Sequence, residues 1–320
     1  LGVIMVIYLG GTRVINGGWT VGVFSTYMIM FAALAKKASN AAKLFNSVQK
    51  SQVSWYRIKP YLTEYKTKDT TKNIEKSQTR LVVKSLSFRY PAAQENIIAN
   101  INFSAHQGEI IGVTGSIAAG KSTLGLSLLG LYPYSGNISI DGRELKDYSQ
   151  YERSQMISHL GHNPQLLSDT IYNNITLGQN VDITAVLQDV CFDTDLAAMP
   201  TGVNTLVGNS GIRLSGGQQA RIALARTLLH QNKIIILDDP FSAVDMQTEE
   251  KIIENLKNNY QDSLIILISH RLAIFSRIDR IVLLYSDKTM DCGTHRQLMK
   301  NSELYAAIYN LQQRAGESNE

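Results

Sequence analysis

The eight residues from Gly115 to Ser122 most constrain the fold of this chain, because they read G-S-I-A-A-G-K-S and fit the pattern G-x-x-x-x-G-K-S. An apolar run precedes them and favours a β-strand, and the residues after Ser122 favour a helix. In such a loop, backbone N–H groups converge on phosphate oxygens, and the helix N-terminus adds partial positive charge. Lys121 would neutralise the terminal phosphates, and the Ser122 hydroxyl would bind Mg²⁺. A simple glycine turn is the alternative.

Short apolar or β-branched runs alternate with helical stretches from residue 81 onward, and no internal repeat is visible. Fully apolar strands of this length are typical of a parallel sheet that is covered on both faces. We therefore predict an α/β fold for this part of the chain. The expected strands lie within residues 81–88, 96–103, 109–115, 137–140, 233–238, 263–270 and 280–285.

The N-terminal part contains 22 consecutive uncharged residues between Arg13 and Lys36. As a helix at ~1.5 Å per residue, this run could cross the ~30 Å of bilayer hydrocarbon. The turn residues 16–18 place the start of the helix near Thr20, and residues 1–12 would end an earlier span. A signal peptide is one alternative, but the chain lacks the basic start that such a peptide has. A buried core helix is another, but it would not explain the Lys36-Lys37 pair. We predict insertion into a membrane.

The apolar positions keep a helical period from Lys36 to about residue 61, which indicates an amphipathic extension into the cytosol that Pro60 ends or bends. Residues 64–79 are rich in Lys, Thr and Asp and resemble a linker. We therefore expect a membrane part in residues 1–60, a linker in 61–79 and an α/β domain in 80–320. The chain begins without a Met inside an apolar segment, so we expect a fragment of a longer protein.

The net charge of +4 is unevenly distributed, with +9 in residues 36–84 and −6 in residues 85–320. A basic excess directly behind an apolar span indicates the cytoplasmic side of a membrane, whereas nucleic-acid binding requires a basic stripe on the folded domain. We expect no nucleic acid as a partner. The two cysteines, Cys191 and Cys292, are too few for a disulfide framework, which favours a reducing compartment.

A second candidate element is the apolar strand that ends at Asp238-Asp239. Asp238 could reach the shell of a Mg²⁺ ion at the phosphate loop, and Asp239 would then point to an attacking water. A solvated turn before Pro240 is the alternative.

A third element is Leu214-Ser215-Gly216-Gly217-Gln218 at the start of a helical run. Two glycines and a serine at a helix start form a second end that attracts anions, and an ordinary helix cap is the alternative.

Together, these three elements resemble the nucleotide-binding domain of the ATP-binding cassette (ABC) transporters, in which the pentapeptide is the signature motif. The resemblance covers the whole chain. It implies that Tyr90 stacks on adenine, that Gln165 lies in the loop that touches the membrane domain, and that His270 contacts the γ-phosphate. Residues 242–245 resemble the loop that crosses the dimer, and residues 205–211 resemble an exporter-specific loop. In isolation, Tyr90, Gln165 and His270 each have an ordinary structural explanation.

The resemblance also implies the ligands, ATP and Mg²⁺, and the residues that would bind them. Asp239, His270 and Gln165 would serve catalysis, and Ser122, Gln165 and Asp238 would face the metal. The nucleotide would contact Tyr90, Gly115, Ser116, Ala118, Ala119, Gly120, Lys121, Ser122 and Thr123 on one chain, and Ser215, Gly216, Gly217, Gln218 and Asp245 of a second chain.

Residues 1–60 resemble the last spans of an exporter-type half-transporter. This implies a multi-pass protein of the plasma (inner) membrane with its ATPase domain in the cytoplasm. Its partners would be the lipid bilayer, a second half-transporter subunit and a solute that the sequence does not identify.

The chain departs from the family pattern at three positions. Asp239 stands where hydrolytic members carry glutamate, Ala118 stands where glycine is commoner and requires a negative φ, and Asn209 replaces an expected glutamate. When a catalytic base is displaced by about 1 Å, the rate can fall ~10²-fold, so we expect slow ATP hydrolysis at this site. We therefore expect a heterodimer in which this site is the degenerate one. A homodimer is the alternative. A regulatory ATP clamp is a second hypothesis. A soluble cassette ATPase of the DNA-repair type is a third, and residues 1–60 argue against it.

Overall fold

The computed structural model describes residues 2–59, 80–90, 93–208 and 214–317. The chain divides into two compact units with a boundary between residues 71 and 72. The expected linker at 61–79, and Pro60 before it, lie outside the described residues.

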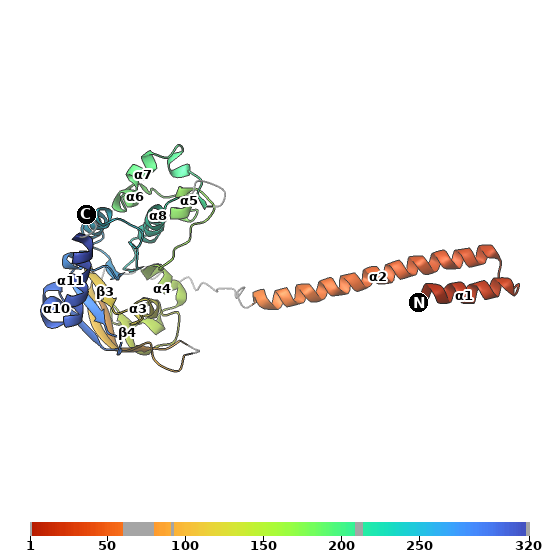
Figure 1. Ribbon diagram of the computed structural model, residues 1–320, viewed down its shortest axis with the longest axis horizontal. Coiled ribbons are helices and arrows are strands. Elements are labelled where there is room, and N and C mark those ends of the chain that lie inside the picture. The colour runs from red at the N-terminus through yellow and green to blue at the C-terminus, as the bar shows by residue number, and fades with distance from the viewer. Residues whose placement is uncertain (1, 60–79, 91–92, 209–213, 318–320) are drawn as a thin grey trace. The chain divides into compact units, whose positions relative to one another are not determined.

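The first unit is a helical hairpin of α1 (Gly2–Ile15) and α2 (Val21–Ile58), shown in Figure 1. The Thr20 hydroxyl caps α2 by accepting a hydrogen bond from the backbone N–H of Val23, which confirms the expected start of this helix. Close packing joins the two helices, because a Cβ atom at Gly10 would lie 2.5 Å from the Phe24 ring.

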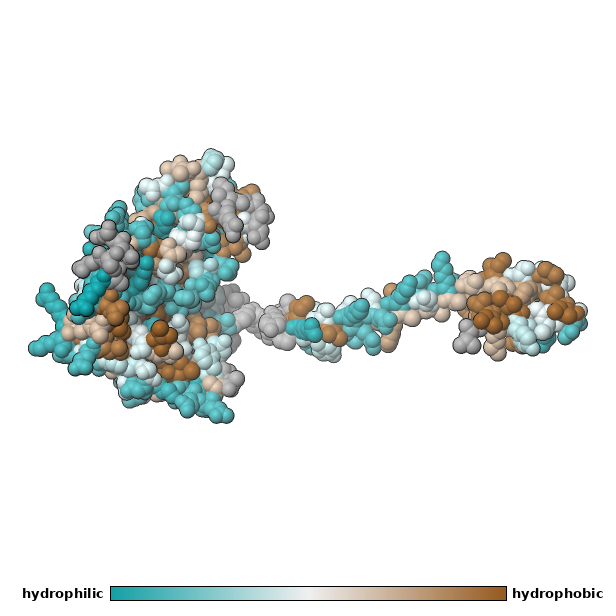
Figure 2. Space-filling view, viewed as in Figure 1, coloured by the Kyte–Doolittle hydropathy of each residue, from teal (hydrophilic) through white to brown (hydrophobic). Residues whose placement is uncertain are grey.

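Among the described helices, α2 is long and apolar enough to cross a membrane, and no part of its apolar window is buried within the structure. Apolar side chains gather over α1 and the first part of α2 in Figure 2, and polar side chains become frequent toward the end of α2. Exposed apolar side chains at this density require a covering partner, such as lipid or other helices.

The second unit contains a six-stranded sheet in the order β10-β9-β3-β8-β7-β6. All pairs in it are parallel except β10 with β9. The runs near 109–115, 233–238, 263–270 and 280–285 are confirmed as parallel strands, since they are apolar on both faces as such a sheet requires. The strands are β3 (Ile110–Gly115), β6 (Ile157–Leu160), β7 (Ile234–Asp238), β8 (Leu264–Ile268), β9 (Arg280–Leu284) and β10 (Met290–Gly293).

A separate four-stranded antiparallel sheet has the order β2-β1-β4-β5. The runs near 81–88, 96–103 and 137–140 are confirmed as strands, and they belong to this second sheet. Burial alternates along β1, so one face is buried and the other is solvated, as is common in antiparallel sheets. Its strands are β1 (Arg80–Phe88), β2 (Ile98–His106), β4 (Ser135–Ile140) and β5 (Arg143–Glu144).

The parallel sheet is the middle layer of this unit, because each of its faces lies in a different hydrophobic cluster. Ile235 and Leu237 of β7 pack in a cluster with residues of α8 and α9, whereas Ile234 and Ile236 of the same strand pack in a cluster with β1, β2, β4 and α3. This two-sided burial fixes which ends of the strands meet at one edge.

Helices α5, α6, α7 and α8 form a group that lies apart from α3, β3 and β4 in Figure 1. The start of α8 in this group carries residues 215–218. The helices are α3 (Lys121–Leu128), α4 (Gln150–Met156), α5 (Ile171–Thr176), α6 (Thr184–Asp189), α7 (Asp193–Ala197), α8 (Gly216–Leu228), α9 (Met246–Asn259), α10 (His295–Asn301) and α11 (Glu303–Glu317).

Candidate functional site

The site is built at the carboxyl ends of four neighbouring parallel strands, β3, β8, β7 and β6. In open α/β sheets, ligands bind outside these ends. The strand order places the phosphate loop after β3, His270 after β8, Asp239 after β7 and His162 after β6 in that sequence along the edge. Asp239 therefore lies between the two histidines.

Two glycines of the phosphate loop leave no room for a side chain. Gly115 has a φ of 144°, and a Cβ atom there would lie 2.0 Å from the Leu284 carbonyl oxygen. Gly120 has a φ of 89°, and its Cβ atom would lie 2.5 Å from the Ile98 side chain. The glycines let the backbone curve tightly, which leaves N–H groups free to face an anion.

Lys121 begins α3, and its ammonium donates to the carbonyl oxygens of Gly115 at 3.1 Å and Ser116 at 2.8 Å. Burial lowers the pKa of the half-buried Lys121, and the carboxylates of Asp238 and Asp239 oppose this shift. Within the described residues, the ammonium hydrogen-bonds to these two carbonyl oxygens at the loop mouth, and a phosphate oxygen would be a stronger acceptor.

The expectation of a negative φ at Ala118 is wrong, because its φ is +63°. Ala118 is exposed at the loop, whereas Ala119 is buried and takes no positive φ. An alanine in the left-handed region costs about 1 kcal/mol relative to glycine, so this loop is strained. Ser122 is exposed, and Thr123 is buried.

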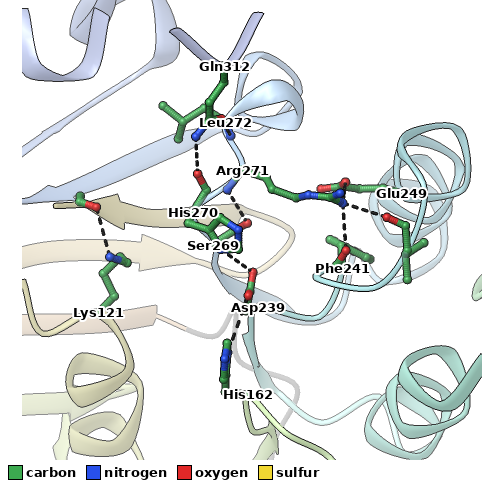
Figure 3. A network of polar contacts seen from close by, with 12 residues as sticks. Lys121, His162, Asp239, Phe241, Glu249, Ser269, His270, Arg271, Leu272 and Gln312 are labelled. Atoms are coloured by element: carbon green, nitrogen blue, oxygen red, sulfur yellow. Dashed lines mark hydrogen bonds and ion pairs between the residues drawn. The ribbon is translucent and has the colours of Figure 1, made fainter. Parts of the chain in front are cut away.

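Asp238 and Asp239 at the end of β7 are both buried, at 6% exposure. Asp239 has a φ of +54°, and its backbone N–H donates to the Ile268 carbonyl oxygen at 2.8 Å, which turns its carboxylate to the mouth of the site. His270 Nδ1 lies 3.1 Å from Asp239 Oδ1, and His162 Nδ1 lies 3.6 Å from Oδ2, as Figure 3 shows.

Asp239 Oδ1 is buried and has no hydrogen-bond partner among the described residues, because the His270 ring is not oriented to donate to it. A buried unsatisfied carboxylate oxygen requires an explanation such as a bound water or ligand. The site thus fits a nucleotide with Mg²⁺: a loop of N–H groups, the Lys121 ammonium at its mouth, and two buried carboxylates whose charges act on that ammonium. No group of three His, Cys, Asp or Glu side chains in the described segments could bind a metal alone. This agrees with Mg²⁺ chemistry, since that ion uses one or two protein oxygens together with phosphates and waters.

The structure does not bring Gln165 into this group of side chains. Gln165 is exposed, and its backbone carbonyl accepts a hydrogen bond from Arg226 at 3.1 Å. The side chain of this loop that reaches Asp239 is His162, which follows β6 directly. Sequence analysis missed His162, because β6 before it reads I-S-H-L and lacks the apolar run that marks β8 before His270.

Ser215 is the N-cap of α8 and forms a capping box with Gln218. Both the capping and the anion-binding interpretations therefore apply to the same residues. Ser215 and Gly216 are exposed, and a Cβ atom at Gly217 would lie 2.7 Å from the Ala243 carbonyl oxygen. This helix start thus packs on the loop of residues 242–245 while it presents its N-terminus outward.

Asp245 is exposed and caps α9 by accepting a hydrogen bond from the Thr248 backbone N–H at 2.9 Å. Hydrogen bonds from Thr248 lower the pKa of Asp245. Tyr90 packs edge-on against Phe88 and Tyr132, with ring centroids 5.0 Å and 6.0 Å away. Asn209 and the end of the expected 205–211 loop lie outside the described residues.

Three features lie on the same domain: a phosphate loop after β3, two carboxylates at the end of β7, and a glycine-rich start of α8. Together they define a P-loop nucleotide-binding protein. Residues 98–242 match the family model of the ABC transporter. The chain belongs to the ABC transporter family.

Relatives with known names support this assignment. The chain is 31% identical over 304 residues to an ATP-dependent lipid A-core flippase of Pseudomonas syringae pv. tomato, covering 93% of this chain and 51% of the relative. It is 31% identical over 313 residues to the multidrug resistance-like ATP-binding protein MdlA of Escherichia coli, covering 95% and 52%. The chain thus spans about half the length of the curated relatives it matches.

A solved structure shares the fold. It is described as a bacterial Atm1-family ABC exporter with ATP bound, and it has a TM-score of 0.74 and 24% sequence identity over 92% of this chain and 53% of that chain. This likeness shows the fold, a long helical segment followed in the chain by an α/β domain.

Proposed function

We propose that this chain is the ATP-binding and ATP-hydrolysing part of an ABC exporter subunit, which couples MgATP binding and hydrolysis to transport across a membrane. The observation that carries this proposal is the convergence of Lys121, Asp239 and His270 at one sheet edge, in a chain that also presents an exposed signature helix start. The names of the relatives, a lipid flippase and a multidrug resistance-like protein, support export as the process.

In this proposal, ATP is held by the phosphate loop, with Lys121 against its terminal phosphates and Tyr90 against the adenine. Ser122 and Asp238 would hold Mg²⁺, which supplies charge neutralisation for the phosphates when bound. Water attacks the γ-phosphorus, the bond to the bridging oxygen breaks, and ADP leaves with that oxygen. Asp239 accepts a hydrogen bond from the attacking water through its unsatisfied Oδ1 and orients it.

His270 and His162 lie on the two sides of the Asp239 carboxylate. We assign the loop contact with the catalytic carboxylate to His162 rather than to Gln165. A role for Gln165 in metal binding or in contact with the membrane part remains a prediction.

The site on this chain is proposed to hydrolyse ATP slowly. The Asp239 side chain is one methylene shorter than glutamate, and its attachment at a buried strand end leaves it little freedom to extend. A misplacement of about 1 Å can cost ~10²-fold in rate. The signature of this chain would complete a site on a second half-transporter, so a heterodimer is favoured and a homodimer is the alternative.

A regulatory ATP clamp is a second candidate, favoured by the same short carboxylate and the strained Ala118. In a clamp, ATP holds the dimer together while the partner hydrolyses. Trapped nucleotide separates the two, because a clamp retains ATP in this site whereas a working exporter site accumulates ADP. A soluble cassette ATPase is disfavoured by the exposed apolar side chains of α2.

The membrane part of the proposal rests on α2. The twelve basic residues in 36–84 would lie at the cytoplasmic surface, as the positive-inside rule requires. We propose a multi-pass protein of the plasma membrane with its ATPase domain in the cytoplasm.

The decisive experiment compares Asp239→Glu with the parent, in the full-length protein purified with its partner. Turnover at this site should rise about 10- to 100-fold, because the longer carboxylate reaches the attacking water. ATP binding should stay unchanged. Unchanged turnover would show that the length of this carboxylate does not limit hydrolysis.

Two controls accompany this measurement. Lys121→Ala should weaken ATP binding about 10- to 100-fold, the loss expected for a hydrogen-bonded charge, and Lys84→Ala, an exposed lysine on β1, should not. If Lys121→Ala binds ATP as tightly as the parent, the proposed nucleotide site is wrong.

A further inference from the structure

Gln312 of helix α11 hydrogen-bonds to the segment that carries His270. Its amide Nε2 donates to the His270 carbonyl oxygen at 2.7 Å, and its Oε1 accepts from the Leu272 backbone N–H at 2.8 Å. Figure 3 shows both bonds on one side of the loop. One amide therefore fixes the backbone on both sides of Arg271.

This double contact holds backbone groups that lie beyond the sheet. Strand β8 ends at Ile268, and the Ser269 N–H still donates to the Val113 carbonyl oxygen of β3 at 3.1 Å. The carbonyl of His270 and the N–H of Leu272 bond to Gln312 instead. A primary amide offers a donor and an acceptor side by side, which matches the carbonyl and N–H of an extended backbone. Alanine at position 312 would remove both bonds at once.

The other side of the segment is held by Arg271. Its guanidinium donates to the carbonyl oxygens of Phe241 at 2.9 Å and Val244 at 2.8 Å and to the buried Glu249 carboxylate at 2.9 Å. The Ser269 hydroxyl accepts from the Arg271 backbone N–H at 3.0 Å. The backbone of residues 269–272 is thus clamped between α11 and the loop that precedes α9.

The His270 imidazole itself is exposed, and its ion-pair contact is the Asp239 carboxylate at 3.1 Å. A side chain with so little packing depends on its backbone for its position. Helix α11 can supply that position because Tyr305, which is fully buried, anchors it to the domain and accepts or donates a hydrogen bond at His295 Nδ1.

We propose that Gln312 is a positioning residue of the nucleotide site, through which the C-terminal helix sets the backbone of His270 and thereby the placement of its imidazole beside Asp239. This inference rests on the proposed function, since His270 matters only if ATP is bound and hydrolysed there. It implies that a contact or modification that displaces α11 would change turnover without touching the nucleotide.

The test compares Gln312→Ala with Gln313→Ala, a matched control because Gln313 is the next residue on the same helix and is exposed. Both are made in the full-length protein assembled with its partner. For Gln312→Ala we expect kcat for ATP to fall about tenfold with KM unchanged, because loosening a catalytic group by a fraction of 1 Å reduces the rate but not ground-state binding. Gln313→Ala should match the parent.

A double-mutant cycle with His270→Ala separates positioning from general destabilisation. If Gln312 acts through His270, adding Gln312→Ala to His270→Ala causes no further loss of turnover. Additive losses would overturn the proposal. Gln312→Glu keeps the acceptor for the Leu272 N–H and loses the donor to the His270 carbonyl. Its kcat should therefore lie between those of the parent and of Gln312→Ala.

A second readout does not depend on hydrolysis. Hydrogen exchange of the segment 269–272 should slow on adding MgATP in the parent and in Gln313→Ala, but not in Gln312→Ala. Equal protection in all three would refute the positioning role. Failure of the parent to bind ATP would instead refute the proposed function, so the two failures are distinguishable.

Discussion

At the scale of the residue, single backbone angles decide how well the phosphate loop is formed. Ala118 adopts a φ of +63° in the loop where glycine would adopt it freely. Asp239 adopts +54°, but an aspartate tolerates this region better than alanine because its short polar side chain can bond locally. The loop therefore keeps its glycine-dependent shape at Gly115 and Gly120 and stores strain at Ala118.

We predict that Ala118→Gly raises the free energy of unfolding by about 1 kcal/mol, because it relieves the left-handed alanine. Ala119→Gly is the matched control. Ala119 is buried and takes no positive φ, so glycine there should lower stability by a similar amount. Urea unfolding of both variants measures the difference, and a loss of stability in Ala118→Gly would contradict the strain argument.

At the scale of the element, a buried ion pair joins helix α9 to the segment after β8. Glu249 is 1% exposed, its Oε2 accepts from Arg271 at 2.9 Å, and its Oε1 has no hydrogen-bond partner among the described residues. Burial raises the pKa of Glu249 to about 7, although Arg271 opposes the shift. The desolvation of one unsatisfied oxygen thus outweighs the attraction of one guanidinium.

This raised pKa predicts a pH-dependent stability. Between about pH 4.5 and about pH 7, the folded state keeps a proton on Glu249 that the unfolded state has lost, so the free energy of unfolding falls as pH rises through this window and then levels off. The Glu249 contribution is about 3 kcal/mol. Glu249→Gln should lack this part of the fall when urea unfolding is measured at about pH 5 and about pH 8.

Glu250→Gln is the control for this experiment, because Glu250 forms an exposed pair with Arg277, and such pairs contribute little. Its pH profile should follow that of the parent. A profile of Glu249→Gln that also follows the parent would show that Glu249 is ionised in the folded protein at neutral pH.

At the scale of the whole molecule, one chain offers two different half-sites. The phosphate loop lies at the sheet edge, whereas the signature lies at the exposed start of α8 in a separate helical group, as Figure 1 shows for the second unit. A helix N-terminus with exposed Ser215 and Gly216 can accept an anion from outside the chain. This arrangement supports a dimer in which each signature faces the nucleotide of its partner.

We predict that Ser215→Asp lowers hydrolysis at the partner's phosphate loop at least tenfold and leaves nucleotide binding at Lys121 unchanged. Aspartate preserves the helix cap, but its charge repels a triphosphate. Ser215→Asn, which preserves the cap without charge, should retain more activity. Labelled nucleotide trapped on each subunit of the assembled protein gives the readout. If hydrolysis falls equally on both subunits, the assembly is a homodimer. If hydrolysis falls only on the partner subunit, the assembly is a heterodimer.

Local patterns in the sequence predict the features that depend on neighbouring residues. The phosphate loop between a strand and a helix, the strand ending at Asp238-Asp239 and the start of α2 after Thr20 all follow from local patterns. Local conformational preference and hydrophobic period govern such elements, so a window of about ten residues contains the information.

The features that depend on strand order and on packing across long sequence separations come from the tertiary structure. It divided the strands between two sheets, placed His162 rather than Gln165 beside Asp239, set a positive φ at Ala118, and brought Gln312 to a segment 40 residues away. These features depend on backbone pairing between strands that lie far apart in the sequence, such as β3 with β8 and β9. The order of the strand ends then selects which loops share an edge, and no local pattern encodes that order.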